Sequence, residues 1–349
     1  MSPPAARSPG LRHARLLIVA AVLAALAVPI VLGGRDALLR TLNFPLRGYL
    51  VLFAVIAASW LARALKLWLL LRRLGLRPGL AHLFVISLAI DLAYISTPAG
   101  VGGYAASIYY LRRTGASVSG ATTVTAADQI LDLAFFTLVL PLAGVSLLWS
   151  ELPQALAILA FATGATMLAI GLGVLLARRH IVRWMLADNA LVRRWPALRR
   201  RQHILHEFLV SLGANTRVLV SGGPRVAAAI AALTAAQWVM KYGVLWVTLA
   251  LLGHPVSFAL TLLLQALILH AAMWTGVPAG GGGAELGLTA ALAPWVVATD
   301  TATALLLWRL ATFELCLVSG VAAALVLARW KAAAPASAAH DIAAGERAG

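Results

Sequence analysis

The sequence predicts an all-α, polytopic integral membrane protein, and three observations support this prediction. Of the 349 residues, 62% are hydrophobic and 11% are charged, whereas soluble domains are close to half apolar and a quarter charged. Apolar runs of about 20 residues, long enough to cross a hydrocarbon core, recur along the chain. A motif rich in proline and glycine occurs twice, each time at the end of an apolar run.

The apolar runs define the predicted spans and a single transmembrane domain over residues 1–331. The spans lie near residues 16–34, 49–71, 118–149, 154–177, 226–252 and 301–328. Basic residues precede the first run as in a signal peptide, but further spans follow it, so we expect a retained first helix. We expect residues 332–349 to form a disordered C-terminal tail.

Two further apolar segments, near 80–97 and 257–277, are predicted to form broken, re-entrant hairpins. The first runs into Pro98-Ala-Gly100-Val-Gly102-Gly103 and the second into Pro278-Ala-Gly280-Gly-Gly282-Gly283. Proline removes a backbone donor and glycine favours non-helical dihedral angles, so both helices should break at these motifs. The short apolar helices that follow, 103–111 and 284–293, cannot span a membrane alone.

The two motifs are offset by 180 residues and indicate an internal repeat. The same offset maps the span 49–71 onto 229–251. The repeat units therefore cover about 49–149 and 226–328, each in the order span, broken hairpin, span. Agreement in both motif and element order is harder to obtain by chance than apolar similarity alone.

Charged loops predict the orientation of these units. Between residues 178 and 225, ten arginines less two acids give +8, half of the formal net charge of +16. The positive-inside rule places this basic loop and both termini in the cytoplasm, so the first hairpin enters from the cytoplasm and the second from outside. We therefore expect the two units to be inverted relative to each other. One loop disagrees, since Arg35, Arg40 and Arg47 against Asp36 should lie outside, on a short interfacial helix.

Inverted repeats whose broken helices meet near the midplane are typical of transporters, which bind substrate at the repeat interface. Non-helical backbone at membrane depth must be satisfied by protein or by a water-filled cavity. Tight helix packing is the alternative explanation of the two breaks. The predicted substrate-binding residues of the turns are Pro98, Gly100, Gly102, Pro278, Gly280 and Gly282. We expect Gly102 and Gly282 to occupy tight backbone bends that face a cavity.

Nine charged residues fall inside apolar segments. They are Asp91, Asp128, Asp132, Glu285, Glu314, Arg63, Lys66, Lys241 and Arg309. Each needs a partner or a cavity, because inserting a charge at a helix centre costs about 2.5–3.5 kcal/mol. Arg63 and Lys66 are close to the cytoplasmic end of their span, and we expect them to snorkel towards the headgroups.

Asp128 and Asp132 lie four residues apart on one helix face, where two carboxylates repel each other unless a proton or a cation intervenes. Arg309, in the equivalent span of the second unit, is their predicted counter-ion. Its guanidinium could receive the phosphate of an anionic lipid at the repeat interface. A structural ion pair with Glu285 or Glu314 is the alternative, and both readings stay open.

Three more residues complete the predicted substrate-binding set. Glu285 opens the short helix after Gly280–Gly283, where its charge suits the helix dipole, and a plain N-terminal cap is its alternative role. His270 and Lys241 lie deep in their segments. Each of these two residues either contacts the substrate or packs internally with its polar atoms hydrogen-bonded, and both interpretations stay open.

Several chemistries are absent from the sequence. It contains no Walker-type loop, no GxGxxG after a strand, no HExxH and no Gly-x-Ser-x-Gly, and its single cysteine, Cys316, gives no metal-thiolate spacing. We expect no catalytic residue, no cofactor and no metal ion, so that transport would be passive, ion-coupled or driven by a partner. The charge pattern favours anionic lipid headgroups over nucleic acid, with a homo-oligomer or a cytosolic partner at the basic loop as open alternatives.

These motifs resemble the lysylphosphatidylglycerol synthase transmembrane-region family, also called flippase-like. The similar stretches are Ser-Trp-Leu-Ala-Arg63-Ala-Leu-Lys66-Leu-Trp, the Pro98 hairpin, the Pro278 hairpin with Glu285, and Leu-Trp-Arg309-Leu, within residues 45–330. The family usually carries an acid after the first glycine turn and an arginine in the following span, whereas Gly103 and Gln129 stand here. The resemblance implies an inner-membrane protein that moves lipids between leaflets. No acyltransferase domain follows the last span, so lysyl transfer is not expected.

The predicted function is that of a lipid flippase or lipid transporter, moving an anionic or isoprenoid-linked lipid between leaflets. One alternative is a membrane-embedded enzyme on a lipid carrier, with Asp128 and Asp132 as acid and base, although such groups usually lie at an aqueous loop. The other is a non-catalytic membrane subunit that scaffolds a lipid-modifying complex through its basic loop.

Overall fold

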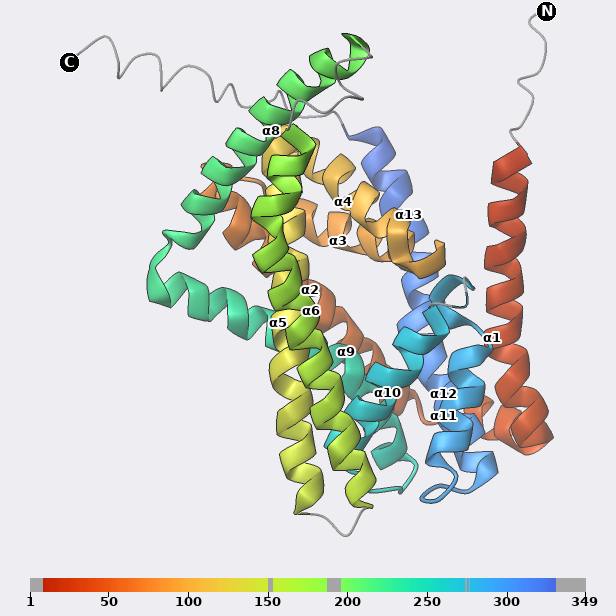
Figure 1. The fold of residues 1–349 in the computed structure, drawn as a ribbon. Coiled ribbons are helices and arrows are strands. Elements are labelled where there is room, and N and C mark those ends of the chain that lie inside the picture. Colours follow the sequence, from red (N-terminus) through yellow and green to blue (C-terminus); the bar gives the residue numbers. More distant parts are fainter. Residues whose placement is uncertain (1–8, 150–152, 187–195, 274, 276, 331–349) are drawn as a thin grey trace, which may run out of the picture.

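The computed structural model describes residues 9–149, 153–186, 196–273, 275 and 277–330. Within them every regular element is a helix and no strand occurs, so the predicted all-α class is confirmed. Five helical runs are long and apolar enough to cross a membrane (Figure 1). They are α2 (Leu46–Arg73), α5 (Val118–Leu148), the Gln154–Gly173 part of α6 (Gln154–Leu186), α9 (Gly223–Leu251) and the continuous α12–α13 run, Ala298–Arg329. The predicted tail 332–349 lies outside the described residues.

Helix α1 (Pro9–Leu42) contains the first predicted span, 16–34, whose side chains 16–22 lie outside the described part of the chain. The helix bends at Gly34, where φ is 65°. Arg35 and Arg40 therefore lie on a separate helical segment, whereas Arg47 belongs to α2. The interfacial position outside the membrane stays a prediction. This segment is tied to α12 by the ion pair between Arg40 and Asp300.

Each half of the molecule contains a broken hairpin with the same order of elements. The first consists of α3 (Leu80–Ile95), the 3-10 turn η1 (Pro98–Gly100) and α4 (Val101–Arg112). The second consists of α10 (Phe258–Met273), the 3-10 turn η2 (Pro278–Gly280) and α11 (Gly283–Leu292). Turns η1 and η2 contact each other, with α3–α4 above and α10–α11 below in Figure 1. The inverted orientation across a membrane stays a prediction.

The two turns share an unusual backbone. Ala99 and Ala279 both have a φ of 50°, and Gly100 and Gly280 follow with φ of 69° and 64°. The left-handed region costs an L-residue about 1–2 kcal/mol, so the surroundings must hold both alanines in place. Two proline–glycine motifs 180 residues apart therefore fold into nearly identical turns.

The predicted tight bend at Gly102 is wrong, because the bend lies two residues earlier, at Gly100. Gly102 belongs to α4, and a Cβ there would lie 2.5 Å from Cγ2 of Thr97. Gly282 does bend, with a φ of 82°. Its open side faces α1, where an added Cβ would lie 3.3 Å from Ala24, so it packs against a helix and does not face a cavity.

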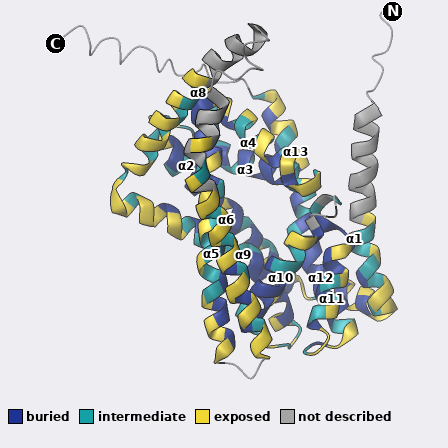
Figure 2. Cartoon of the chain, viewed as in Figure 1, coloured by how far each residue is buried: buried dark blue, intermediate teal, exposed yellow. Residues whose placement is uncertain are grey.

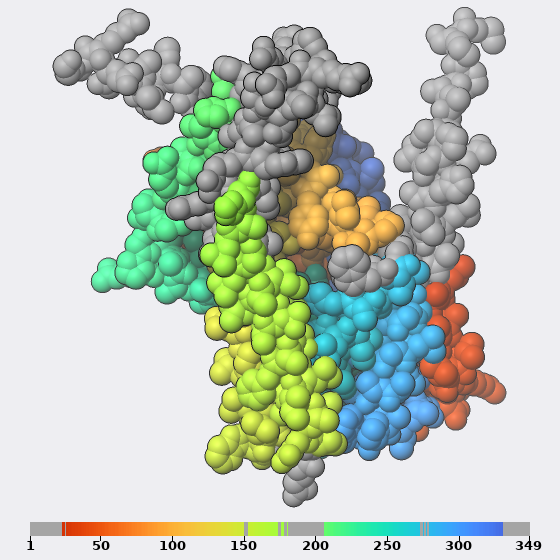
Figure 3. Space-filling model, in the orientation of Figure 1, coloured from red at the N-terminus to blue at the C-terminus, as the bar shows by residue number. Residues whose placement is uncertain are grey.

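Packing centres on α2 and α9, which lie against each other, while α3 packs on α13 and α5 on α6. Figure 2 shows buried residues gathered between these helices and exposed residues on the outer faces. The outer face of α5 carries large apolar side chains such as Leu138 and Leu142, each 67% exposed. Such a surface fits contact with lipid rather than with water. In the space-filling view of Figure 3, α4 lies above α10 and α11 on one face of the molecule.

The predicted basic loop 178–225 is helical over most of its described length. Helix α6 extends to Leu186, and α8 (Pro196–Val220) begins after residues that lie outside the described part. α8 is fastened to α5 at Ser119, whose hydroxyl lies 2.6 Å from that of Ser211. The predicted cytoplasmic side of this segment stays a prediction.

Candidate functional site

Six charged side chains from four helices meet inside the membrane-spanning part and form what we call the six-charge cluster. They are Arg63 and Lys66 on α2, Asp91 on α3, Asp128 and Asp132 on α5, and Lys241 on α9. Three cations thus face three acids. A balanced set is the form in which buried charges are tolerated, because each loses its hydration and needs a partner in return.

The spacing of these residues explains how the cluster forms. Arg63 and Lys66 share one face of α2, and Asp128 and Asp132 share the facing side of α5. Lys66 Nζ lies 2.6 Å from Asp128 Oδ1 and 3.1 Å from Asp132 Oδ1. Arg63 pairs with Asp91 and reaches Asp128 Oδ2 at 3.3 Å.

These contacts correct two expectations. Arg63 and Lys66 do not snorkel, since they are 5% and 0% exposed. They, and not Arg309, are the counter-ions of Asp128 and Asp132. The sequence offset places Arg309 in the equivalent span but cannot show which helices face each other.

The side chains of the cluster are buried on the α2 side and more exposed on the α9 side. Trp238 Nε1 donates a 2.8 Å hydrogen bond to Asp132. The side chain of Lys241 is 30% exposed, and its Nζ lies 3.5 Å from Asp91 Oδ2, a longer contact than those made by Lys66. We call Asp132, Trp238 and Lys241 the open edge.

His270 reaches the same region from α10. The ring of Phe136 on α5 lies against both Trp238 and His270, at centroid distances of 4.9 and 5.8 Å. Nδ1 of His270 lies 2.5 Å from the carbonyl oxygen of Ala266 in the preceding turn. The structure therefore brings three predicted site residues, Asp132, Lys241 and His270, to one edge between α5, α9 and α10.

Arg309 and Glu285 form a second, separate ion pair, which we call the turn pair. Arg309 Nε donates to Glu285 Oε1, and Nη2 donates to the carbonyl of Ala279 at 3.2 Å. The other carboxylate oxygen of Glu285 accepts from the backbone N–H of Gly282 at 2.7 Å. Glu285 is thus both the cap of α11 and a structural counter-ion, and the turn pair fastens η2 to α12. Arg309 and Glu285 are 3% and 0% exposed.

Among the described residues, no such pair holds the turn of the first hairpin. Gln129, which the offset of 180 aligns with Arg309, donates a 3.1 Å hydrogen bond to the hydroxyl of Tyr94. The ring of Tyr94 covers Gly103, where a Cβ would lie 2.2 Å from the ring. Turn η1 is therefore held by neutral contacts.

Sequence reasoning missed the aromatic members of the site. Trp60 donates to Asp91 at 3.2 Å, Trp238 donates to Asp132, and Tyr94 receives Gln129. The three-residue spacing of Trp60 to Arg63 and of Trp238 to Lys241 puts each indole on the same helix face as a buried cation. That spacing is the signal that could have identified the two tryptophans.

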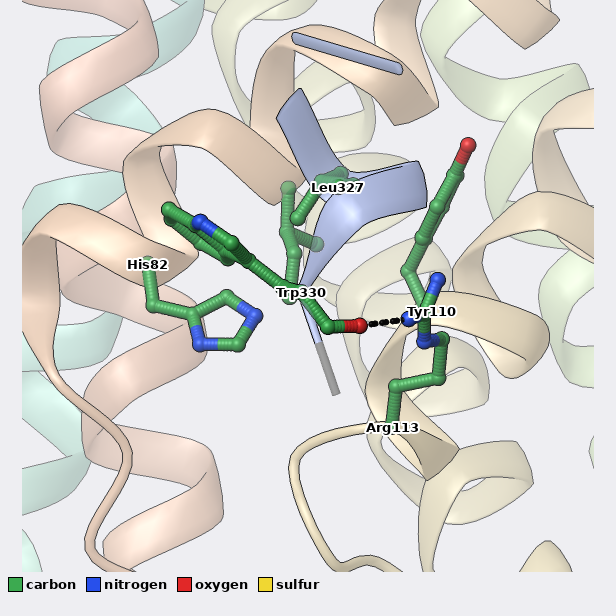
Figure 4. A pocket seen from close by; sticks show the side chains of 6 residues that line it. His82, Tyr110, Arg113, Leu327 and Trp330 are labelled. Carbon is green, nitrogen blue, oxygen red and sulfur yellow. Dashed lines mark hydrogen bonds between the residues drawn. The ribbon is translucent and has the colours of Figure 1, made fainter. Parts of the chain in front are cut away.

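Two hollows lie outside the six-charge cluster and the turn pair. At one end Arg113 donates to the backbone carbonyl of Trp330, whose ring lies 4.4 Å from that of His82 (Figure 4). These contacts around the small pocket hold the end of α13 against α3 and α4. The other is an apolar groove of about 380 Å³. Its lining residues are Val55, Val239, Met240, Gly243, Trp246, Val247 and Phe258.

A comparison with known protein families identifies the family of the chain. Residues 13–320 match the family described as the lysylphosphatidylglycerol synthase TM region. A comparison with curated proteins finds no match. The match covers most of the chain and agrees with five helical runs of membrane-spanning length. This multi-pass membrane protein belongs to the lysylphosphatidylglycerol synthase transmembrane-region family.

Proposed function

We propose that the protein moves lipids between the leaflets of a bacterial inner membrane, passing the polar headgroup along the contact of its two broken hairpins. The observation that carries this proposal is that turns η1 and η2 touch each other within a bundle of helices of membrane-spanning length. Interrupted helices that meet inside a membrane supply polar backbone groups where lipid tails supply none. A charged headgroup needs such a polar route.

The open edge is the proposed headgroup site. Lys241 is the most exposed cation of the six-charge cluster and makes its longest ion-pair contact, 3.5 Å to Asp91. An anionic phosphate could replace Asp91 as the partner of Lys241, because the lysine ammonium is a compact point charge that binds phosphate oxygens as well as carboxylate oxygens. Arg309 is committed to Glu285 and Ala279, so we assign it the role of fastening the turn.

We assign the apolar groove to part of an acyl chain of the lipid. It lies on α2, α9 and α10, and no polar side chain except the indole of Trp246 lines it. That indole N–H already donates to the carbonyl of Val256 at 3.0 Å. A volume of about 380 Å³ falls in the range of ligand pockets.

The enzyme alternative has less support from the geometry. A general acid or base must be within hydrogen-bond reach of its substrate. Asp128 is 1% exposed, and its oxygens face Arg63 and Lys66. Of the two aspartates only Asp132 reaches the open edge, so the predicted acid–base pair of Asp128 and Asp132 does not face a substrate there.

The test uses the purified full chain in phosphatidylcholine vesicles that contain a trace of fluorescent phosphatidylglycerol or phosphatidylcholine. A membrane-impermeant quencher reports how fast the label crosses between leaflets. We expect the protein to speed the crossing, and Lys241→Gln to slow phosphatidylglycerol by about tenfold, the loss of one weak charged contact of about 1.4 kcal/mol. Lys241→Arg should keep most of the rate.

Arg225→Gln is the matched control, because Arg225 is an exposed cation on the same helix. It should leave both lipids unaffected. A crossing rate equal to that of protein-free vesicles would refute the proposed function. Normal phosphatidylglycerol crossing in Lys241→Gln would remove Lys241 from the headgroup site and leave the function itself intact.

A further inference from the structure

Glu314 lies at a break in the last membrane-spanning run. The turn η3 (Leu310–Glu314) is a π-helical turn between α12 (Ala298–Arg309) and α13 (Leu315–Arg329). It falls near the middle of the apolar run Ala298–Arg329. Single π-helical turns inside longer helices occur frequently at functional sites.

The carboxyl group of Glu314 has no hydrogen-bond partner among the described residues. Both of its oxygens are buried, and the backbone amide close to them is its own. Arg309 and Glu285 are within electrostatic range, but the guanidinium of Arg309 already donates to Glu285 and to Ala279. Two acids thus stand near one arginine, and only Glu285 is paired with it.

In the part of the chain that the structure describes, the helices around Glu314 offer it no unpaired cation. Turn η3 packs against α2 and α9, whose cations inside the bundle are Arg63, Lys66 and Lys241. All three are paired with the aspartates of the six-charge cluster. Within the described part of the chain, Arg309 and Glu285 are the charged groups that act on Glu314.

A buried carboxylate in this position would be costly. Leaving an ionised group desolvated and unpaired costs several kcal/mol, whereas a bound proton removes the charge. Two carboxylates near one cation also disfavour double ionisation. The neutral acid is therefore the form that fits the observed contacts.

We propose that Glu314 is a proton-binding site that controls the turn pair. With its proton bound, Glu314 leaves Arg309 to Glu285, and η2 stays fastened to α12. When the proton leaves to water, the Glu314 carboxylate competes with Glu285 for Arg309 and loosens the second hairpin. This inference rests on the proposed function in one respect, because it makes the proton the ion coupled to lipid movement.

The protonated state can be tested without any transport. Infrared spectra of the purified full chain at neutral pH should contain the C=O stretch of a protonated carboxyl group, and Glu314→Gln should lose it. Glu285→Gln should weaken that band, because Arg309 is then free to pair with an ionised Glu314, and the exposed-acid control Asp36→Asn should keep it. Absence of the band from the wild type, or its persistence in Glu314→Gln, would overturn the proposal.

Thermal unfolding at neutral pH separates the two acids that share Arg309. Glu285→Gln should lower the unfolding midpoint, because it removes the carboxylate that joins Arg309 to the backbone N–H of Gly282. Glu314→Gln and Glu314→Leu should leave the midpoint unchanged or raise it, since removing an unpartnered buried polar group costs little. A loss in both Glu314 variants as large as that in Glu285→Gln would mean an ionised, paired Glu314 and would refute the proposal.

Coupling is tested in the same vesicles that test the proposed function. An imposed pH gradient should change the crossing rate of phosphatidylglycerol several-fold in the wild type and in the exposed-acid control Asp36→Asn. In Glu314→Gln the gradient should have no effect. Lipid crossing that ignores the gradient in the wild type would refute coupling while the proposed function stands. If the wild type moves no lipid, the proposed function fails, and the infrared and unfolding results decide whether Glu314 binds a proton.

Discussion

The two hairpins share a backbone but differ in how their turns are held. Turns η1 and η2 have the same left-handed alanine, with φ of 50° at Ala99 and at Ala279. Around η2 the turn pair, Arg309 with Glu285, fastens the backbone to α12. Around η1 the position equivalent to Arg309 is Gln129, and it meets the neutral hydroxyl of Tyr94.

The charges of the first half lie elsewhere. Arg63 and Lys66 tie α2 to α3 and α5 through three aspartates, so they join whole helices and not a turn. The comparison teaches that one backbone motif can be stabilised by different chemistry in each half. Breaking the first set of charges should loosen the bundle, whereas breaking the second should loosen one hairpin.

The largest effect is expected for Lys66→Met. Lys66 is fully buried, and its removal leaves Asp128 with Arg63 alone and Asp132 without a cation. Breaking a buried ion pair from one side costs about 3–5 kcal/mol. Thermal unfolding in detergent should show this loss, and Asp132→Asn in the same chain should recover part of it. Unchanged stability of the single variant would mean that the cluster is hydrated and not a helix tie.

The next largest effect is expected for Arg309→Ala. This change leaves Glu285 buried with only the backbone N–H of Gly282 as a partner, and we expect a loss of about 3 kcal/mol. Arg309→Lys should lose less, since it keeps the charge but not the contact to both Glu285 and Ala279. Unfolding and limited proteolysis of the second hairpin measure both.

A double-variant comparison identifies the partner of Arg309. Glu285→Gln should ease the loss caused by Arg309→Ala, because the two residues share one interaction. Asp128→Asn should add its own loss without easing it. Relief by Asp128→Asn in place of Glu285→Gln would restore the counter-ion assignment that the structure overturns.

A smaller effect is expected for Gly282→Val. A β-branched residue is strained at a φ of 82°, and its Cβ would press on Ala24 of α1 at 3.3 Å. We expect a loss of about 2 kcal/mol from the left-handed backbone and the contact together. Gly283→Ala is the matched control, because its Cβ would meet Ala272 at an ordinary 3.8 Å. Equal midpoints for the two variants would contradict the assigned bend.

The smallest effect is expected for Gln129→Leu in the first hairpin. It removes one neutral hydrogen bond to Tyr94, which contributes about 0.5–1.5 kcal/mol. Tyr94→Phe should give a similar loss, and the double variant should lose no more than either single change. A loss as large as that of Arg309→Ala would mean that the two turns are held equally strongly.

The sequence predicts the backbone of this protein better than its ion pairs. Proline and glycine act on their own peptide units, so the two broken hairpins follow from local chemistry. The one error was the position of the first bend, which was predicted at Gly102 and lies at Gly100. The pairing of Lys66 with Asp128 depends on which faces of α2 and α5 meet, and no local pattern contains that information. For the same reason the repeat led to Arg309 being assigned as the counter-ion of Asp128 and Asp132, whereas it pairs with Glu285. The indoles of Trp60 and Trp238 were not expected in the site either.

The proposed route for the headgroup depends most directly on hairpins that enter from opposite sides of the membrane. Single cysteines at Glu151, Ala190 and Ser257, in a chain with Cys316→Ala, can be labelled in intact cells with a membrane-impermeant maleimide. The account predicts labelling at positions 151 and 257 from outside and at position 190 only after the cells are opened. Labelling of positions 151 and 190 from the same side would contradict the inverted arrangement and, with it, the proposed path between the leaflets.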